Sequence, residues 1–345
     1  MGTATFDLKR TLLAPLLVPG VAGALSAVTG ARATIFMLHR FAVPALGVEG
    51  HDPRALRHDL AHLRRRGREL VSLEEMFRRL EVGEPLRGAV AFTIDDGYFD
   101  HARVAAPVFA ELGCPVTIFV TTGFVDGLCW FWWDKLTVVF ETTAKSIVRL
   151  RLAGEELVYT LDSAAARRRA NADLNLRLTN VSEAERRCCV DDLARLAGVE
   201  LPVVPPPRFA PMSWDEARAL EGAGVSFGPH TVTHPILSSA PDAQATLEIT
   251  ESWRRLAAEV AHPVPVFCYP NGRSSDFGSR ETEVLRRLGL CGAVTGEPAP
   301  VDPSAFRRSA AARFAVPRYG FRDDLPFLLQ SVCGLEALKA RLRRS

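Results

Sequence analysis

Two pairs of residues in this sequence have the chemistry of a metal-dependent hydrolytic site. The first pair, Asp95 and Asp96, precedes Gly97 and directly follows an apolar run that ends at Ile94. Two neighbouring carboxylates can divide the work of hydrolysis, because one can bind a metal ion while the other acts as a general base. An Asp-Asp-Gly triplet is also common in solvated turns, so this motif carries little weight alone.

His230 and His234 form the second pair, four residues apart. Pro229 and Pro235 enclose them, which favours a loop over a helix. In such a loop both imidazoles can reach one cation, and histidine mixed with aspartate is an ordinary ligand set for Zn²⁺ or a related divalent ion. The alternative is that both side chains only form hydrogen bonds with the loop backbone.

Two further polar segments stand at or near the ends of apolar runs. One follows Phe267 and reads Cys-Tyr-Pro-Asn-Gly-Arg up to Arg273, and the other contains His39 after the run that begins at Ile35. Neither segment would be distinctive alone. Four such segments at predicted strand ends, however, indicate one shared active site.

The motifs need a fold that brings strand ends together. After residue 33, short runs rich in β-branched and aromatic residues alternate with amphipathic stretches, which predicts repeated β/α units. Seven such strands favour one α/β barrel over two domains, and barrel active sites lie at the carboxyl ends of the strands. The predicted strands are 34–38, 89–94, 115–120, 225–228, 264–269, 291–295 and 314–318.

Capping residues predict where several helices begin. Asp52 followed by Pro53 is an N-cap with proline at the first helical position, ahead of leucines that share one face. Two capping boxes are predicted as well. They are Ser72 with Glu75 and Ser213 with Glu216.

The β/α pattern is interrupted between about residues 126 and 211. Residues 147–152 and 156–161 predict a hairpin, and polar helical stretches follow, so we interpret this region as an insertion into the barrel. Its aromatic opening, residues 130–134, offers flat faces that can stack on sugar rings. We favour the alternative that these rings seat the insertion on the barrel.

Composition excludes several classes of protein. Of 345 residues, 48% are hydrophobic and 24% are charged, which excludes a disordered chain and a polytopic membrane protein. Lysine and arginine total 42 against 40 acidic residues, a net charge of +2 that argues against nucleic acid as a partner. Seven cysteines without a CxxC pair predict reduced, mostly buried thiols.

Residues 1–33 form an apolar N-terminal segment in which residues 11–31 carry no charge. We favour a segment that docks on the protein or lies on a membrane surface, in a cytoplasmic or membrane-associated protein. The alternatives are a secretory signal cleaved near residues 31–33, which implies a secreted or periplasmic protein, and a membrane span. Pro15 and Pro19 argue against the span.

In its motifs the chain resembles the polysaccharide deacetylase family, which is carbohydrate esterase family four and includes the nodulation-type chitooligosaccharide deacetylases. The family's first motif falls on residues 95–97, and the second falls on His230, Thr231 and His234. The third falls on residues 269–271, with asparagine in place of the more common aromatic residue. The resemblance runs from about residue 34 to residue 318.

This resemblance implies an α/β fold, a distorted barrel of seven β/α units, which we place at residues 34–340 with the helical and hairpin insertion. It implies that Asp96, His230 and His234 bind a divalent metal, most readily Zn²⁺, with Co²⁺ or Ni²⁺ as alternatives. It also implies that Asp95 is the general base.

The catalytic acid is where this sequence departs from many family members. They take the acid from a histidine near the carboxyl end, but no histidine follows His262 here. Residues 37–40 instead resemble the "YHR" strand of a permuted exopolysaccharide deacetylase branch. We therefore predict that His39 is the acid, because imidazole titrates near neutral pH. The alternative is a histidine that only satisfies backbone groups.

The remaining site residues surround the predicted base and the substrate carbonyl. Tyr269, Pro270 and Asn271 are candidates for substrate and oxyanion contacts, through a backbone N–H near Asn271. Arg318 and Arg273 are candidates to pair with Asp95 and tune it.

Together these features predict a metal-dependent hydrolase that removes N-acetyl groups from an oligo- or polysaccharide containing N-acetylglucosamine. A near-neutral chain agrees with an uncharged acetylated substrate. One alternative is an O-acetyl polysaccharide esterase with the same site. Another is a non-catalytic glycan-binding protein on the same scaffold.

Overall fold

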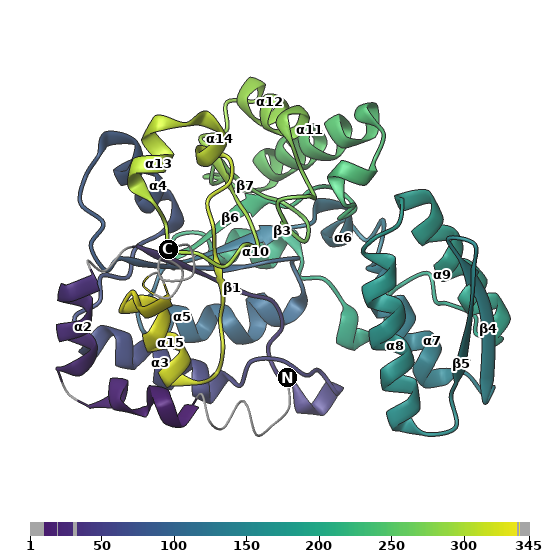
Figure 1. Cartoon of the computed structure of the whole chain (residues 1–345). Coiled ribbons are helices and arrows are strands. Elements are labelled where there is room, and N and C mark those ends of the chain that lie inside the picture. Colours follow the sequence, from purple (N-terminus) through teal and green to yellow (C-terminus); the bar gives the residue numbers. More distant parts are fainter. Residues whose placement is uncertain (1–9, 19, 30–32, 337, 339–345) are drawn as a thin grey trace.

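The core of the molecule is a parallel β-sheet surrounded by helices (Figure 1). The computed structural model describes residues 10–18, 20–29, 33–336 and 338. Five strands pair in the order β6-β3-β2-β1-β9, and β7 pairs separately with β8. Their bounds are β1 (Thr34–Leu38), β2 (Val90–Ile94), β3 (Val116–Val120), β6 (Val225–Pro229), β7 (Val266–Cys268), β8 (Gly292–Val294) and β9 (Tyr319–Gly320).

Single contacts link the separate pair to both edges of the larger sheet. The amide of Val264, just before β7, donates to the carbonyl of Phe227 in β6 at 2.7 Å. On the other side, Val294 of β8 forms a parallel bridge with Val316, just before β9. The seven strands therefore follow one another around a ring, which confirms the predicted α/β fold and gives it the form of a distorted barrel.

Six of the seven predicted strands lie within two residues of the observed ones, and the last prediction is wrong. Phe314 caps the short helix α14 (Ala310–Arg313), and only Val316 of the predicted strand 314–318 forms a bridge. Pro317 follows and has no N–H to extend a ladder. The strand begins instead at Tyr319.

Helices and short helical turns cover the outside of the ring. Asp52 accepts a hydrogen bond from the amide of Arg54, as its predicted capping role requires. The bounds are η2 (Pro44–Leu46), α3 (Pro53–Arg65), α4 (Leu73–Val82), the π-helical turn η3 (His101–Ala105), α5 (Ala106–Glu111), α6 (Thr122–Val125), η4 (Pro207–Phe209), α10 (Trp214–Leu220), η5 (Leu237–Ser239), α11 (Asp242–Glu259), α12 (Ser279–Arg287), α13 (Pro303–Arg308) and α15 (Leu325–Val332).

Only one of the two predicted capping boxes is complete. Ser213 and Glu216 bond each other's backbone amides at the start of α10. At α4, Ser72 accepts from the amide of Glu75, but the Glu75 carboxylate is bound by Arg78 and Arg79 instead. Together these arginines donate to both carboxylate oxygens of Glu75, whereas Arg103 takes one oxygen of Glu216 and the other accepts from the amide of Ser213.

The core consists of apolar side chains between the sheet and the helices. Leu56, Leu60 and Leu63 of α3, predicted to share a face, are fully buried there. None of the seven cysteines forms a disulfide in the structure, and four of them are buried. The fold thus needs no disulfide.

The predicted insertion is placed to one side of the barrel (Figure 1). It consists of α7 (Trp132–Thr142), the antiparallel hairpin β4 (Ile147–Leu152) and β5 (Glu155–Thr160), α8 (Ala164–Leu178) and α9 (Glu183–Ala197). It has an apolar core of its own, with members such as Leu136, Leu150 and Leu174. The hairpin lies within one residue of its predicted position.

A cluster of aromatic residues joins the insertion to the barrel. Trp130 and Phe131 are buried and pack with Tyr98 and Phe124 of the barrel. This packing agrees with the interpretation that the rings seat the insertion.

The N-terminal segment lies against the barrel where it is described. It contains η1 (Ala14–Leu17) and α2 (Val21–Thr29), and Leu13 and Leu16 are buried in the main core. Among the described residues, no helix has the length and apolarity needed to cross a membrane. Residues 31 and 32 of the predicted cleavage site lie outside the described residues, so that alternative stays a prediction.

Candidate active site

Three predicted metal ligands converge at the carboxyl ends of β2 and β6. Asp96 Oδ1 lies 3.6 Å from Nε2 of His230 and 3.5 Å from Nε2 of His234. All three side chains are buried, and their ligand atoms lie within 4.8 Å of one another. One carboxylate and two imidazoles at this spacing fit the preferences of a divalent ion such as Zn²⁺.

A sharp bend of the backbone after β2 positions the aspartate pair. Asp96 has a φ of 92° and Gly97 has a φ of 96°, a left-handed conformation that favours glycine. A Cβ atom at Gly97 would also lie 3.3 Å from Val125 and 3.4 Å from Val120. The glycine of the motif is therefore required by the bend that turns Asp96 toward the histidines.

His230 is oriented by the neighbouring strand β7. Its Nδ1 lies 2.8 Å from the carbonyl of Cys268, to which it donates when protonated there, so that Nε2 faces Asp96. Burial disfavours the charged imidazole, but Cys268 and Asp96 outweigh burial and raise the pKa of His230. A proton and a metal ion therefore compete for the same position next to Asp96.

His234 lies on a tight turn that is stabilised by a neighbouring residue of the same loop. Its φ is 60°, and its amide donates to Oγ1 of Thr231 at 3.0 Å. Burial and the neighbouring His230 lower the pKa of His234 to about 3. Its imidazole is therefore neutral at ordinary pH, which is the form that binds metal.

Glu248 of α11 holds the same loop from outside, a role that our sequence analysis missed. Its carboxylate accepts from the amides of Val232 and Thr233, both at 2.8 Å, and from the hydroxyl of Thr233 at 2.6 Å. Glu248 is buried on a helix face shared with Ala245 and Ile249. An acidic residue on the apolar face of a helix is the signal that would have found it.

Asp95 is held by Arg318, as predicted for one of the two candidate arginines. Nη1 and Nη2 of Arg318 each donate to one carboxylate oxygen of Asp95 at 2.7 Å. The guanidinium also donates to Thr93 Oγ1 and to the carbonyl of Thr295, both at 2.9 Å. Burial alone would raise the pKa of Asp95, but Arg318 outweighs it and holds this pKa below the usual carboxyl range.

The thiol of Cys268 completes the surroundings of this ion pair and was also missed. Sγ lies 3.1 Å from Nη2 of Arg318 and 3.5 Å from Oδ2 of Asp95. Cys268 ends β7 and is fully buried. Only its position at a strand end, next to the predicted third motif, could have indicated a place in the site.

His39 lies across from Asp95 at the end of β1. Its Nε2 is 4.0 Å from Oδ2 of Asp95, and 48% of its side chain is exposed, in contrast to the buried ligands. The carbonyl of His39 contacts the imidazole of the buried His101, which fixes the backbone at this point. His39 is thus next to the base and open to solvent.

The other predicted residues lie on the segment that follows β7. Tyr269 is turned toward the helices α11 and α12, where its ring stacks on Phe277 at 3.9 Å. Pro270 is buried, and Asn271 is exposed with a φ of 57°. Arg273 is exposed on the following turn, so Arg318 and not Arg273 is the partner of Asp95.

Aromatic rings from the insertion form one wall of the site. The rings of Trp133 and Phe131 meet the edge of His234, with centroids 4.9 and 5.5 Å away. Trp133 Nε1 donates to the hydroxyl of Tyr98, which in turn donates to the buried Asp134 at 2.7 Å. The insertion therefore supports a predicted metal ligand as well as the barrel surface.

The fold and site together define a distorted α/β barrel with a buried Asp-His cluster that could hold a metal ion, beside an ion-paired carboxylate. Residues 191–292 match the family described as "Polysaccharide deacetylase", and this region contains both histidines and Cys268. The predicted resemblance to the polysaccharide deacetylase family is confirmed. No curated protein matches the chain.

Three solved structures share the fold of this chain, and two of them are described as deacetylases. The deacetylase PplD of Streptococcus pyogenes, in complex with acetate, aligns with a TM-score of 0.56 at 18% identity, over 87% of this chain and 98% of its own. IcaB from Ammonifex degensii aligns with a TM-score of 0.55 at 16% identity, over 88% and 98%. The deacetylase domain of BpsB from Bordetella bronchiseptica aligns with a TM-score of 0.50 at 16% identity, over 85% and 98%.

Proposed function

We propose that this protein is a metal-dependent deacetylase that removes N-acetyl groups from an oligo- or polysaccharide containing N-acetylglucosamine. The observation that carries the proposal is the placement of Asp95. It is ion-paired with Arg318, adjacent to the Asp96, His230 and His234 cluster, and 4.0 Å from His39. PplD, which shares the fold, was solved with acetate, the product that we propose here.

Asp96, His230 and His234 would hold the divalent ion, with Zn²⁺ first and Co²⁺ or Ni²⁺ as alternatives. The donor set fits such an ion because two imidazoles and one carboxylate are buried with their ligand atoms within 4.8 Å of one another. When bound, the ion would acidify a water molecule and polarise the substrate carbonyl.

Asp95 would accept a proton from the attacking water. Its lowered pKa keeps it ionised at neutral pH, and Arg318 fixes the direction of both carboxylate oxygens. A low pKa also makes Asp95 a weak base. This weakness is acceptable where the water itself is made more acidic.

His39 would donate a proton to the leaving amine, which is too basic to depart unprotonated. Its half-exposed ring can reach a substrate that binds from solvent, whereas His230 and His234 are buried and would be engaged with the ion. The turn at Asn271 would present a backbone N–H to the developing oxyanion.

Acetate release from acetylated glycans tests this function. Purified protein with a measured metal content should release acetate from N-acetylated chitooligomers or poly-N-acetylglucosamine, detected by mass spectrometry of the glycan products. His234→Ala should lose both the metal and the activity. Acetate release at the wild-type rate by this variant would contradict the proposed site.

His39→Ala tests the acid separately. Because an alkoxide leaves more readily than an amine, this variant should lose more activity on N-acetyl than on O-acetyl substrates. Equal rates for wild type and variant on an N-acetyl substrate would exclude His39 as the acid. Release of acetate from O-acetyl glycans alone would identify an O-acetyl esterase instead.

A further inference from the structure

The N-terminal segment, residues 10–18 and 20–29, presents apolar side chains to solvent. Within ten residues of chain, exposed fractions are 69% for Leu12, 41% for Leu17, 53% for Val18 and 38% for Val21. Apolar side chains gathered in this way on a soluble protein are typical of a surface that binds a partner.

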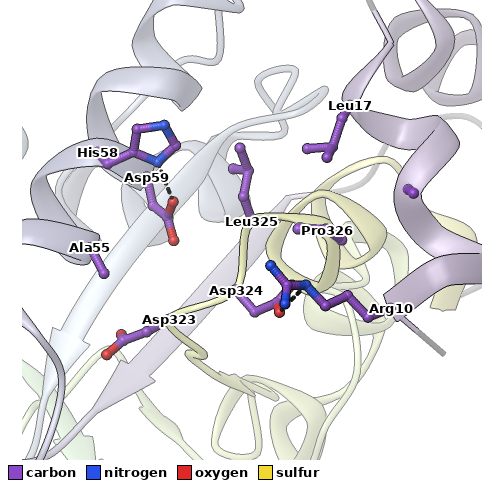
Figure 2. A pocket seen from close by; sticks show the side chains of 10 residues that line it. Arg10, Leu17, Ala55, His58, Asp59, Asp323, Asp324, Leu325 and Pro326 are labelled. Atoms are coloured by element: carbon purple, nitrogen blue, oxygen red, sulfur yellow. Dashed lines mark hydrogen bonds and ion pairs between the residues drawn. The ribbon is translucent and has the colours of Figure 1, made fainter. Parts of the chain in front are cut away.

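The segment is held firmly enough to present these residues in one orientation. Leu13 and Leu16 are buried in the main core, and Arg10 Nε lies 3.3 Å from Oδ2 of Asp324. Arg10 lies beside Asp324 in Figure 2, and both line a cavity between the segment and the barrel whose volume is about 380 Å³. The exposed apolar residues are therefore the outer side of a docked segment.

Arginines border the exposed apolar residues. Nη2 of Arg66 donates to the carbonyl of Leu17 at 3.2 Å, and Nη2 of Arg68 donates to Oγ of Ser26 at 2.7 Å. Arg64 and Arg65 next to them are exposed at the end of α3. The sequence has no acidic residue at positions 8–48 or 60–68, so these two stretches contribute only basic charges to the face, whereas Asp59, Asp323 and Asp324 line the cavity on the inner side of the segment.

We propose that this face docks the protein on an anionic lipid membrane. The apolar side chains would enter the boundary between headgroups and acyl chains, and the arginines would contact the lipid phosphates. A surface position agrees with helices too short to span, since no described helix has the length and apolarity for a span. This inference does not depend on the proposed deacetylase activity.

Vesicle co-sedimentation of the full-length protein tests the proposal. We expect binding to vesicles that contain phosphatidylglycerol, weaker binding to pure phosphatidylcholine vesicles, and weakening by salt because exposed charges are screened. Leu12→Ser combined with Val18→Ser should reduce partition to the anionic vesicles about tenfold. Arg64→Gln combined with Arg65→Gln should reduce it by a similar factor, about tenfold, and make the binding less dependent on salt.

Matched control variants separate the face from general hydrophobicity and charge. Val203 and Val204 are 94% and 73% exposed elsewhere, so Val203→Ser with Val204→Ser should leave vesicle binding unchanged. Arg149→Gln with Arg151→Gln, on the exposed face of β4, should do the same. Equal losses in control and test variants, or no binding of the wild type to anionic vesicles, would overturn the proposal. A dimer dispersed by Leu12→Ser with Val18→Ser, without vesicle binding, would assign the face to a second copy of the chain.

Discussion

Two buried carboxylates on the two sides of the same histidine cluster have opposite electrostatics. Asp95 lies in the barrel and shares two hydrogen bonds with the buried Arg318, which holds its pKa below the usual range. Asp134 lies at the start of the insertion and accepts one hydrogen bond from Tyr98, while burial raises its pKa to about 7. A cation near Asp134, Arg40, is engaged by Asp100 instead.

The difference shows that burial alone does not decide the charge of a carboxyl group. Burial is the largest single influence on the pKa of each residue, and by itself it would raise both pKa values. At Asp95 a guanidinium in bidentate contact outweighs burial, because charge and hydrogen bonding act on the same two oxygens. The barrel therefore keeps Asp95 ionised, whereas Asp134, among the aromatic residues that join the insertion to the barrel, has a pKa of about 7.

The largest effect is expected from Asp95→Asn, with the same substitution at Asp134 as its comparison. Asp95→Asn should reduce acetate release on the order of 10³-fold, because a general base contributes about 10²–10⁴ to such rates. The metal content should stay at the wild-type level, as measured by elemental analysis. Asp134→Asn is the matched control and should stay within about threefold of wild type. Equal losses in both variants would contradict the assignment of Asp95 as the base.

Removing the cation should make Asp95 behave more like Asp134. In Arg318→Met, burial is no longer opposed, so the pKa of Asp95 rises and the acid limb of the activity profile moves to higher pH. We expect a rate loss on the order of 10²-fold at neutral pH. The free energy of unfolding should fall by about 3–5 kcal/mol, because the buried charge of Asp95 loses its partner.

Arg318→Lys is the matched variant, since it retains the charge and loses the bidentate geometry. Its acid limb should lie between those of wild type and Arg318→Met in a plot of kcat/KM against pH. An unmoved acid limb in both variants would contradict the assignment of Asp95 as the titrating base.

Asp134 should change how the free energy of unfolding depends on pH. Its folded pKa of about 7 lies above the unfolded value, so between pH 4 and 7 the unfolded chain binds fewer protons than the native protein. The contribution of Asp134 to the free energy of unfolding therefore falls as pH rises through that window, and it stays constant above it. From pH 5 to pH 8, wild type should lose about 2–4 kcal/mol more than Asp134→Asn in urea unfolding. Parallel curves for the two proteins would show that Asp134 is ionised when folded.

The smallest effect is expected at the thiol beside the ion pair. Cys268→Ala removes the Sγ contacts with Arg318 and Asp95 but keeps the carbonyl that accepts from His230. One weak contact of this kind corresponds to less than about a fivefold change in kcat/KM. A much larger loss, with metal content unchanged, would mean that the thiol contributes together with Arg318 to keeping Asp95 ionised and in place.

Local patterns determined most of the elements that carry the site. The apolar runs predicted six strands to within two residues, because a buried parallel strand needs little beyond short β-branched and aromatic segments. The prediction at residues 314–318 was wrong because a helix cap and Pro317 interrupt an equally apolar run. Apolarity alone could not show where the ladder resumes.

The sequence by itself also determined which residues meet at the predicted metal site. Asp96, His230 and His234 each follow a strand end, and parallel strands bring their carboxyl ends to one edge. The glycine after the aspartates and the prolines around the histidines specify the bends locally. These are short-range effects, and spacing along the chain was enough to predict them.

Only the tertiary structure decided which residues support that site. Arg318 was one of two candidate arginines, and only packing shows that it, and not Arg273, contacts Asp95. Glu248, Cys268 and Trp133 reach the site from distant segments of the chain. Their directions depend on how helices and the insertion pack on the barrel, a long-range consequence that no local pattern contains.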